Sequence, residues 1–225
     1  MRLDNFIEDL CIFETKDDIM RQILTLLFVF VSVHIANAQF AENHAIYLSG
    51  ETGGGNYFNT DLNLNYVFKE NYSLQVGLTG NLRKPISQPD DYFGGLLKTV
   101  FFFGLADPKD MLETYHISAG KIVSLNKSKT IRANLLLGVG YTTIEEPENW
   151  RKVEGSIIEG MVKDNYTWDW EKRHGVSLII NPKIEFPLTQ YWGLTVSPMV
   201  QVNKDRTYFG IGVGSALGLL RPKKR

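Results

Sequence analysis

The stretch from Tyr57 to Leu82 constrains the fold most, because apolar and polar residues alternate along it in two successive runs. In the first run one parity is apolar: Phe58, Leu62, Leu64, Tyr66 and Phe68. After the polar turn 69–71, the second run repeats the pattern with Tyr72, Leu74, Val76, Leu78 and Leu82. A period of two is typical of β-strands, and two such runs across a short turn predict a β-hairpin.

Aromatic residues lie near both ends of this hairpin, at Phe58 on one side and at Tyr66, Phe68 and Tyr72 around the turn. Transmembrane strands are about 9–11 residues long and carry aromatic residues where they meet the two membrane surfaces. The length of the runs and the aromatic positions therefore predict one hairpin of a transmembrane β-barrel.

The same alternation recurs along the chain and predicts eight antiparallel strands in an up-and-down barrel. Their approximate ranges are 44–50, 58–68, 72–82, 115–125, 131–141, 168–186, 192–202 and 209–219. Gly53–Gly55 is expected to end the first strand as a loop, since no Gly-Lys-Ser/Thr follows to make a phosphate loop. Lys121 breaks the alternation, which predicts a snorkelling side chain or a bulge near Gly120. Pro182 and Pro198 lack the ladder donor, so a bulge is expected at each.

The polar parity indicates which side faces lipid. In a water-soluble barrel it would meet water and be rich in Lys and Glu. Here it carries Asn, Ser, Thr, Gln and many glycines. We therefore expect the apolar parity to face lipid and the polar parity to fill a small lumen, with a soluble periplasmic barrel as the alternative. Unpaired charges would be costly there, so ion pairs are expected among Asp61, Arg132, Lys183 and Glu185.

Two long insertions, 83–111 and 145–167, alternate with short turns. Long extracellular loops and short periplasmic turns are the expected asymmetry of outer-membrane barrels, so both insertions are predicted to lie outside the cell. Residues 93–105 are apolar and fit either an amphipathic surface helix or a strand at 97–103. If 96–105 and 155–163 were both strands, the barrel would have ten strands and a narrow lumen for a small hydrophobic solute.

The N-terminal region predicts secretion. Residues 1–19 hold six acidic residues, the wrong sign for the start of a signal peptide, and are expected to be an upstream misannotation. From Met20 a basic residue, an apolar run and Ala36-Asn37-Ala38 follow, which predicts a signal peptide at 20–38 with cleavage after Ala38. The barrel would then occupy 39–225. An N-terminal helix with a membrane anchor is the alternative.

Composition narrows the class further. The formal net charge is −1 and no block of the chain is strongly basic, so nucleic acid is not an expected partner. The mean hydropathy is −0.14, too low for a helical membrane protein but compatible with a barrel whose apolar residues alternate. The one cysteine, Cys11, precedes the predicted cleavage site, so neither disulfides nor thiolate metal sites are expected in the mature chain.

These features together resemble the small OmpA/OmpX-like outer-membrane β-barrels, and in particular the "outer membrane beta-barrel protein" group of Bacteroidota. The resemblance covers residues 39–220 and includes the signal end Ala36–Gln39 and the glycine-alternating last strand. The chain differs at its end, where Leu219–Arg225 replaces the terminal aromatic residue of many such barrels. A Gram-negative outer membrane is the implied location. The expected partners are outer-membrane lipid, lipopolysaccharide and, during biogenesis, the barrel assembly machinery, with the protein a monomer.

Few residues in the sequence suggest a catalytic site. His116 and Ser118 are similar to the His-x-Ser of outer-membrane lipid A deacylases, but no glutamate occurs at the spacing that orients the histidine there, and the parity of both side chains points into the lumen. We expect them to form lumen hydrogen bonds, with a lipid A-modifying hydrolase as the second hypothesis.

Three other groups have simpler interpretations than ligand binding. Glu145, Glu146 and Glu148 could bind a divalent cation, although a solvated loop rim is the simpler interpretation. Three aromatic residues could stack on sugars but are more simply an outer aromatic belt: Tyr166, Trp168 and Trp170. His44 and His174 lack partners at metal-binding spacing. No catalytic, cofactor or metal residue is predicted, and the expected role is structural or surface recognition without catalysis.

Overall fold

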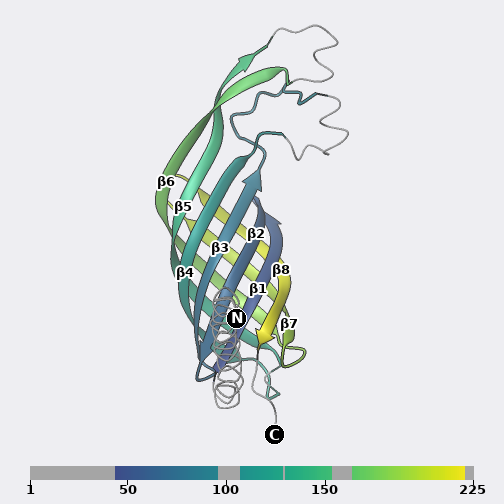
Figure 1. Ribbon diagram of the computed structural model, residues 1–225, viewed down its shortest axis with the longest axis vertical. Helices are drawn as coiled ribbons and strands as arrows, with labels where there is room; N and C mark the ends of the chain where they lie inside the picture. The colour runs from purple at the N-terminus through teal and green to yellow at the C-terminus, as the bar shows by residue number, and fades with distance from the viewer. Residues whose placement is uncertain (1–43, 96–106, 129, 154–163, 221–225) are drawn as a thin grey trace, which may run out of the picture. The chain divides into compact units, whose positions relative to one another are not determined.

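The computed structural model describes residues 44–95, 107–128, 130–153 and 164–220. These form eight strands: β1 (His44–Gly55), β2 (Phe58–Phe68), β3 (Tyr72–Arg83), β4 (Asp110–Ser124), β5 (Arg132–Lys152), β6 (Tyr166–Phe186), β7 (Trp192–Val202) and β8 (Thr207–Leu219). Each strand pairs antiparallel with its sequence neighbours, and β1 pairs with β8, so the sheet closes into a barrel (Figure 1). The predicted eight-stranded up-and-down barrel is confirmed.

The ring leaves no room for ten strands. β3 pairs directly with β4, and β5 pairs directly with β6, so no further strand can enter at either long insertion. The segments that would have supplied the extra strands, 96–105 and 155–163, lie outside the described residues, as does most of the proposed surface helix. The predicted signal peptide and the residues before it also lie outside them. Among the residues that are described, no helix has the length and apolar character to cross a membrane.

The predicted β2–β3 hairpin has the expected register, with Phe58 opposite Leu82 and Phe68 opposite Tyr72. Its turn is tight because the Asn71 amide donates to the Phe68 carbonyl. Lys69 and Glu70 both adopt positive φ, at 50° and 57°. This is the conformation that a type I′ turn requires at its two central positions, and its twist matches that of the two strands.

The glycine run was wrongly predicted to be a loop, because β1 continues through Gly55. Gly53 and Gly55 pass so close to β8 that a Cβ atom would lie within 2.2 Å of the Ile211 carbonyl oxygen at one position and 1.9 Å of the Phe209 carbonyl oxygen at the other. The glycines therefore permit close strand contact rather than ending the strand.

Neither predicted proline bulge occurs. The β6–β7 ladder is interrupted between Ile180, opposite Val200, and Ile184, opposite Val196, and the same register resumes beyond the gap. Pro182 consequently faces Pro198 across this seam. Two residues that lack a backbone donor lie opposite each other, so the loss of ladder hydrogen bonds is confined to one stretch of three residues on each strand.

Lys121 keeps the strand register, so of the two explanations offered for it the bulge is wrong. The pairing of β4 with β3 and β5 runs without a shift through Gly120 and Lys121. The side chain of Lys121 is exposed on the outer face, close to the end of β4. This placement agrees with a lysine that extends towards the aqueous interface.

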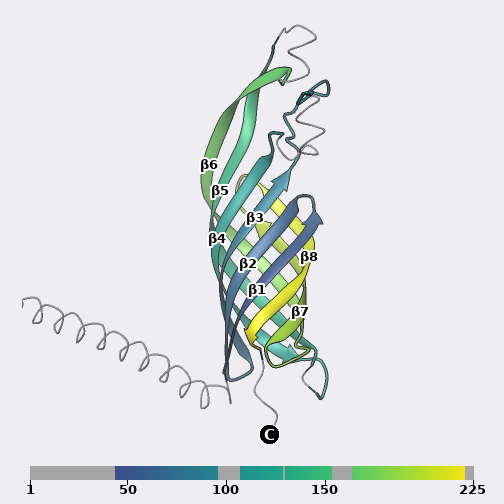
Figure 2. The ribbon, with the colours of Figure 1, turned by 45° about the vertical axis from the view of Figure 1, so that its right-hand side comes forward.

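Both ends of the second insertion belong to strands, because β5 continues to Lys152 and β6 begins at Tyr166. β5 and β6 pair far beyond the last β4 partner, which is Met111 opposite Glu145. We call the segment formed by 146–152 and 166–171 the ribbon. Figures 1 and 2 show that it rises past the other strands at one end of the barrel, which we call the ribbon end. The short turns between β2 and β3, β4 and β5, and β6 and β7 lie at the opposite, turn end.

Candidate functional site

The outer face of the barrel is apolar. Leu64, Val76, Leu135 and Ile211 are 48%, 52%, 54% and 53% exposed, whereas Asn63, Asn65 and Asn134 from the alternate parity are 0% exposed. A water-soluble fold would bury the aliphatic side chains and expose the amides. The apolar parity therefore points outward on all sides of the ring, as predicted.

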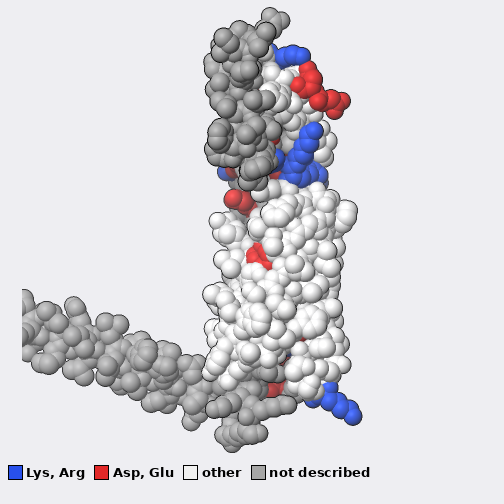
Figure 3. Space-filling view, turned by 90° about the vertical axis from the view of Figure 1, so that its right-hand side faces the viewer, with Lys and Arg blue, Asp and Glu red and all other residues white. Residues whose placement is uncertain are grey.

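Polar residues limit this apolar belt at the ribbon end. On β5 the outward residues run from Ala133 to Tyr141, which at ~3.3 Å per residue and a tilt of ~40° gives a height of about 20 Å. Beyond Tyr141 come Thr143, whose hydroxyl lies 3.1 Å from His174 Nδ1, and then Glu145, which pairs with Lys172. In Figure 3 most of the visible barrel wall carries few charged residues, and charges gather towards its two ends.

The lumen is filled by a charged network near the turn end. Arg132 Nε donates to Glu185 over 2.5 Å, and the Tyr47 hydroxyl donates to the same carboxylate over 2.7 Å. The guanidinium also donates to the Leu220 carbonyl and lies over the Tyr47 ring. The predicted ion pairing among lumen residues is confirmed here, because Arg132 and Glu185 form a largely buried ion pair.

A second charged pair lies in the middle of the lumen. Lys183 Nζ is 2.8 Å from Glu51 Oε1, and both side chains are almost fully buried. Glu51 was not among the predicted lumen charges because the adjacent glycines had been interpreted as a loop. Its position two residues after Ser49, on the inward parity of β1, was the signal that could have identified it.

His116, Ser118 and Asp61 come together in the same region. His116 Nδ1 lies 3.5 Å from the Ser118 hydroxyl, and its Nε2 lies 3.6 Å from Asp61 Oδ1. Asp61 thus occupies the orienting position for which the sequence offered no glutamate. Asp61 also accepts from Thr79 and Asn63, at 2.7 Å and 2.6 Å, so it serves the general lumen network.

The order of these three groups resembles a nucleophile, base and carboxylate, but their surroundings oppose catalysis. All three side chains are buried inside the ring. Towards the ribbon end, the lumen is closed by a cluster of buried side chains: Tyr57, Leu112, Ile144, Ile179, Met199 and Tyr208. A second cluster, built around Tyr47 and Ile122, fills the turn end. Buried side chains therefore enclose Ser118 on both sides along the lumen, and its contacts fit lumen hydrogen bonding.

The predicted acidic cluster is dispersed at the mouth of the barrel. Glu145 pairs with Lys172, while the buried Glu146 carboxylate binds both Arg173 and Arg206. The hydrogen bonds that Arg206 donates to the Glu146 carboxylate raise the pKa of Arg206. These cations already satisfy the carboxylates, and no cluster suited to a metal ion is found in the described part of the chain.

The ribbon carries an aromatic cluster that joins it to the first insertion. Trp150 packs against Tyr92, Tyr166 and Trp168, with ring centroids 5.4, 6.3 and 5.1 Å away. Trp168 in turn contacts Trp170, which is 51% exposed. On β6 these residues lie nearer the ribbon end than the polar positions Lys172 and His174. Their assignment to an outer aromatic belt stays a prediction.

Polar contacts hold the same cluster. Asp91 accepts from Lys152 and from the Tyr166 hydroxyl, each over 2.6 Å, and the hydrogen bond from Lys152 is the main cause that lowers the pKa of Asp91. Burial and the nearby Asp164 carboxylate raise the pKa of Tyr92, so its phenol stays protonated and donates to Asp164. The sequence contained these residues but gave no sign that Asp91 and Lys152 would meet.

Comparison with solved structures finds several proteins to which the chain is similar at low sequence identity. The structures include the attachment invasion locus protein Ail of Yersinia pestis, with 13% identity over 79% of this chain and 98% of that chain and a TM-score of 0.46. The N-terminal β-barrel domain of Pseudomonas aeruginosa OprF has 8% identity over 79% and 98%, with a TM-score of 0.44. Neisserial surface protein A has 10% identity over 77% and 94%, with a TM-score of 0.41.

The other comparisons give no relatives, because no family model matches the chain and no curated protein does. The class defined by the strand topology is a small, closed, eight-stranded up-and-down β-barrel. The eight-stranded up-and-down barrel that the resemblance implied is confirmed by this topology. The grouping with Bacteroidota stays a prediction.

Proposed function

We propose that the protein is a non-enzymatic outer-membrane barrel that holds the ribbon outside the cell as a recognition surface. The observation that carries this proposal is the inverted distribution of side chains, with a continuous apolar belt outside and buried polar groups within. Closure of the sheet supports it, because hydrocarbon offers no partner for an open strand edge. Outer-membrane lipid and lipopolysaccharide would surround the belt, assembly machinery would insert it, and the protein would act as a monomer.

The filled lumen supports a role that does not require transport. Lumen side chains bond one another from Glu185 near the turn end to the Thr114, Thr142 and Gln201 group near the ribbon end. Planar bilayers that contain the purified protein should therefore show no conductance steps. A steady single-channel conductance would contradict the closed lumen and favour a solute pathway.

Fractionation tests the location. After expression in a Gram-negative host, the protein should sediment with outer membranes and migrate faster on a gel before boiling than after it. Recovery in the soluble fraction without such a mobility shift would contradict the proposal.

Labelling tests the orientation. Val153→Cys, directly after the β5 strand of the ribbon, should react with a membrane-impermeant maleimide in intact cells, whereas Lys127→Cys at the turn end should react only after lysis. The opposite pattern would show that the ribbon faces the periplasm.

A further inference from the structure

The seam between β6 and β7 is the place at which both prolines lack a donor. Pro182 lies opposite Leu135 of β5 in a ladder that has no gap there. Pro198 lies opposite Ile211 of β8 in another such ladder. Because alternate residues of a strand hydrogen-bond to opposite sides, the N–H that each proline lacks would have pointed into the seam, where three partner pairs are missing.

Two backbone carbonyls are left without ladder donors at this point. In a hydrogen-bonded antiparallel pair each residue donates to the other's carbonyl, so Pro182 opposite Pro198 removes both donors and keeps both acceptors. No side chain among the described residues donates to either carbonyl, and the adjacent Lys183 ammonium is bonded to a carboxylate and a hydroxyl in the lumen. Ile180 and Val200, at one edge of the gap, are 46% and 39% exposed, so the seam lies within the apolar belt. Hydrocarbon there would offer the carbonyls no partner.

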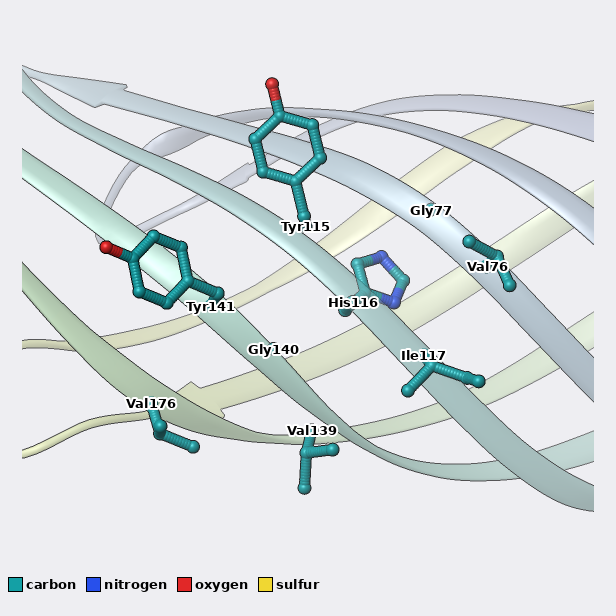
Figure 4. A pocket seen from close by; sticks show the side chains of 9 residues that line it. All are labelled: Val76, Gly77, Tyr115, His116, Ile117, Val139, Gly140, Tyr141 and Val176. Carbon is teal, nitrogen blue, oxygen red and sulfur yellow. The ribbon is translucent and has the colours of Figure 1, made fainter.

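A hollow elsewhere on the wall shows that the seam is an interruption of the backbone and not of the surface. The hollow, of about 460 Å³, is lined by outward side chains of β3 to β6, among them Val76, Val139 and Val176 (Figure 4). Beneath it the ladders of β4 with β3 and with β5 run without a gap. Uneven side chains therefore leave the hydrogen bonds of the wall intact, whereas the facing prolines remove them.

A buried amide on the lumen side of the seam also lacks a partner. Asn181 is 1% exposed, and its Oδ1 accepts from the Ser197 hydroxyl over 2.7 Å, so the side chain reaches from β6 to β7. Its Nδ2 has no hydrogen-bond partner in the described part of the chain. One unused donor and two unused acceptors therefore lie around the same gap.

We propose that the seam binds one ordered water molecule, which donates to the Pro182 and Pro198 carbonyls and accepts from Asn181 Nδ2. Three hydrogen bonds are typical of a buried water, and these three satisfy every unused group at the seam. A metal cation would suit the carbonyls but not an N–H donor, and Lys183 already places positive charge beside Pro182. The water takes the place of the missing ladder bonds. The site does not depend on what the ribbon recognises, although the proposed membrane location is what makes unbonded carbonyls costly.

Nuclear Overhauser spectra between water and the full chain in lipid nanodiscs test the proposal. The side-chain amide protons of Asn181 should give a cross-peak with water. Asn134 is the matched control, because it is 0% exposed and its Oδ1 also accepts from a serine hydroxyl, that of Ser73, but its Nδ2 donates to Glu185. It should give no cross-peak. The absence of a cross-peak at Asn181 would overturn the proposal, and so would equal cross-peaks at both residues, which would indicate exchange through the serine hydroxyls.

Returning the two donors should displace the water. In the double variant Pro182→Val with Pro198→Val, each new N–H faces the opposite carbonyl, so the cross-peak of Asn181 should be lost. Pro187→Val, directly after β6 at the turn end, makes the same change outside the seam and should leave the cross-peak unaltered. A cross-peak that persists in a heat-modifiable double variant would refute the bridging position. If the double variant does not fold, the comparison of Asn181 with Asn134 in the unaltered protein still decides.

The mobility shift on heating separates this inference from the proposed function. A barrel that is heat-modifiable and found in outer membranes but lacks the cross-peak at Asn181 would refute only the water site. A protein that is soluble and not heat-modifiable would refute the proposed function, and the cross-peak would still test the water site.

Discussion

The β5–β6 pair contains two regions held together in different ways. Between Arg132 and Glu145, β5 has a strand on either side, its outward residues are apolar and its inward residues join the lumen network. Beyond Glu145 the two strands pair only with each other among the described residues, and their register shifts between Glu148 and Arg151. There, aromatic rings and exposed ion pairs replace the neighbouring strands.

The difference shows how one continuous hairpin can serve two environments. A two-stranded ribbon is only marginally stable in water by itself, so the ribbon depends on contacts such as those of Trp150 with Tyr92. The barrel region depends on closure of the sheet and on the ion pairs inside it. Substitutions in the barrel region should therefore affect global unfolding, and those in the ribbon should affect only local order.

The largest effect is expected inside the barrel region, at Glu185→Gln. The substitution leaves the buried Arg132 guanidinium without its carboxylate and should lower the free energy of unfolding by about 3–5 kcal/mol. Urea unfolding in lipid vesicles, followed by tryptophan fluorescence, measures the loss. Glu148→Gln on the ribbon is the matched control and should change stability by less than about 0.5 kcal/mol. Equal effects at both positions would remove the distinction between the two regions.

The second-largest loss of stability is expected from a charged substitution in the apolar belt. Leu137 is 57% exposed on the outer face, midway between Ala133 and Tyr141. Leu137→Arg should destabilise the inserted barrel by about 2–4 kcal/mol, the cost of arginine at the centre of a bilayer. Val153→Arg, beyond the belt, should change stability by less than about 0.5 kcal/mol in the same vesicles. If Leu137→Arg is tolerated, the outer face does not meet hydrocarbon.

Trp150→Ala should affect the ribbon alone. Trp150 touches three aromatic rings and donates to Ser87, so its loss should increase trypsin cleavage at Arg151 and Lys152 in intact vesicles about tenfold. The urea midpoint of the barrel should stay within error of the unaltered protein. Trp192→Ala at the turn end is the control and should leave ribbon cleavage unchanged. A barrel destabilised by Trp150→Ala would show that the two regions unfold as one unit.

The smallest expected effect is a change in ribbon structure at acidic pH, caused by protonation of Asp91. Its pKa is lowered by the hydrogen bond from Lys152, so its contribution is present above the unfolded carboxyl pKa of ~3.9 and is lost as the pH falls through the lowered folded value. Ribbon tryptophan fluorescence should therefore be constant from neutral pH to about 4 and change below that. Asp91→Asn should remove this transition. A transition near neutral pH would refute the assignment to Asp91.

The sequence predicted the barrel well where a residue's environment follows from parity alone. Alternation placed Leu64, Val76 and Leu135 outside and His116 inside, because a strand gives each residue one of only two directions. Strand ends and partners across the lumen were harder to predict. The ends of β1 and β5 were missed because glycine and glutamate ordinarily disfavour strands, and close packing against β8 and pairing with β6 outweigh that preference.

Contacts across the ring could not be predicted in the same way. Lys183 meets Glu51, and Asp61 meets His116, through the curvature and stagger of a closed sheet, which no local pattern encodes. The ribbon cluster has the same origin, since Asp91 and Lys152 come from separate insertions.

The facing prolines of β6 and β7 give the cylinder a fixed line of weakness. Every other neighbouring pair of strands keeps an uninterrupted ladder along the barrel wall, whereas this one lacks three consecutive partner pairs around Pro182 and Pro198. Transient local opening of the barrel wall should occur most often there. Backbone amides next to the gap should therefore exchange with deuterium faster than amides of other strands at the same height along the barrel axis. The β6–β7 seam is therefore the part of the barrel wall that is expected to open first.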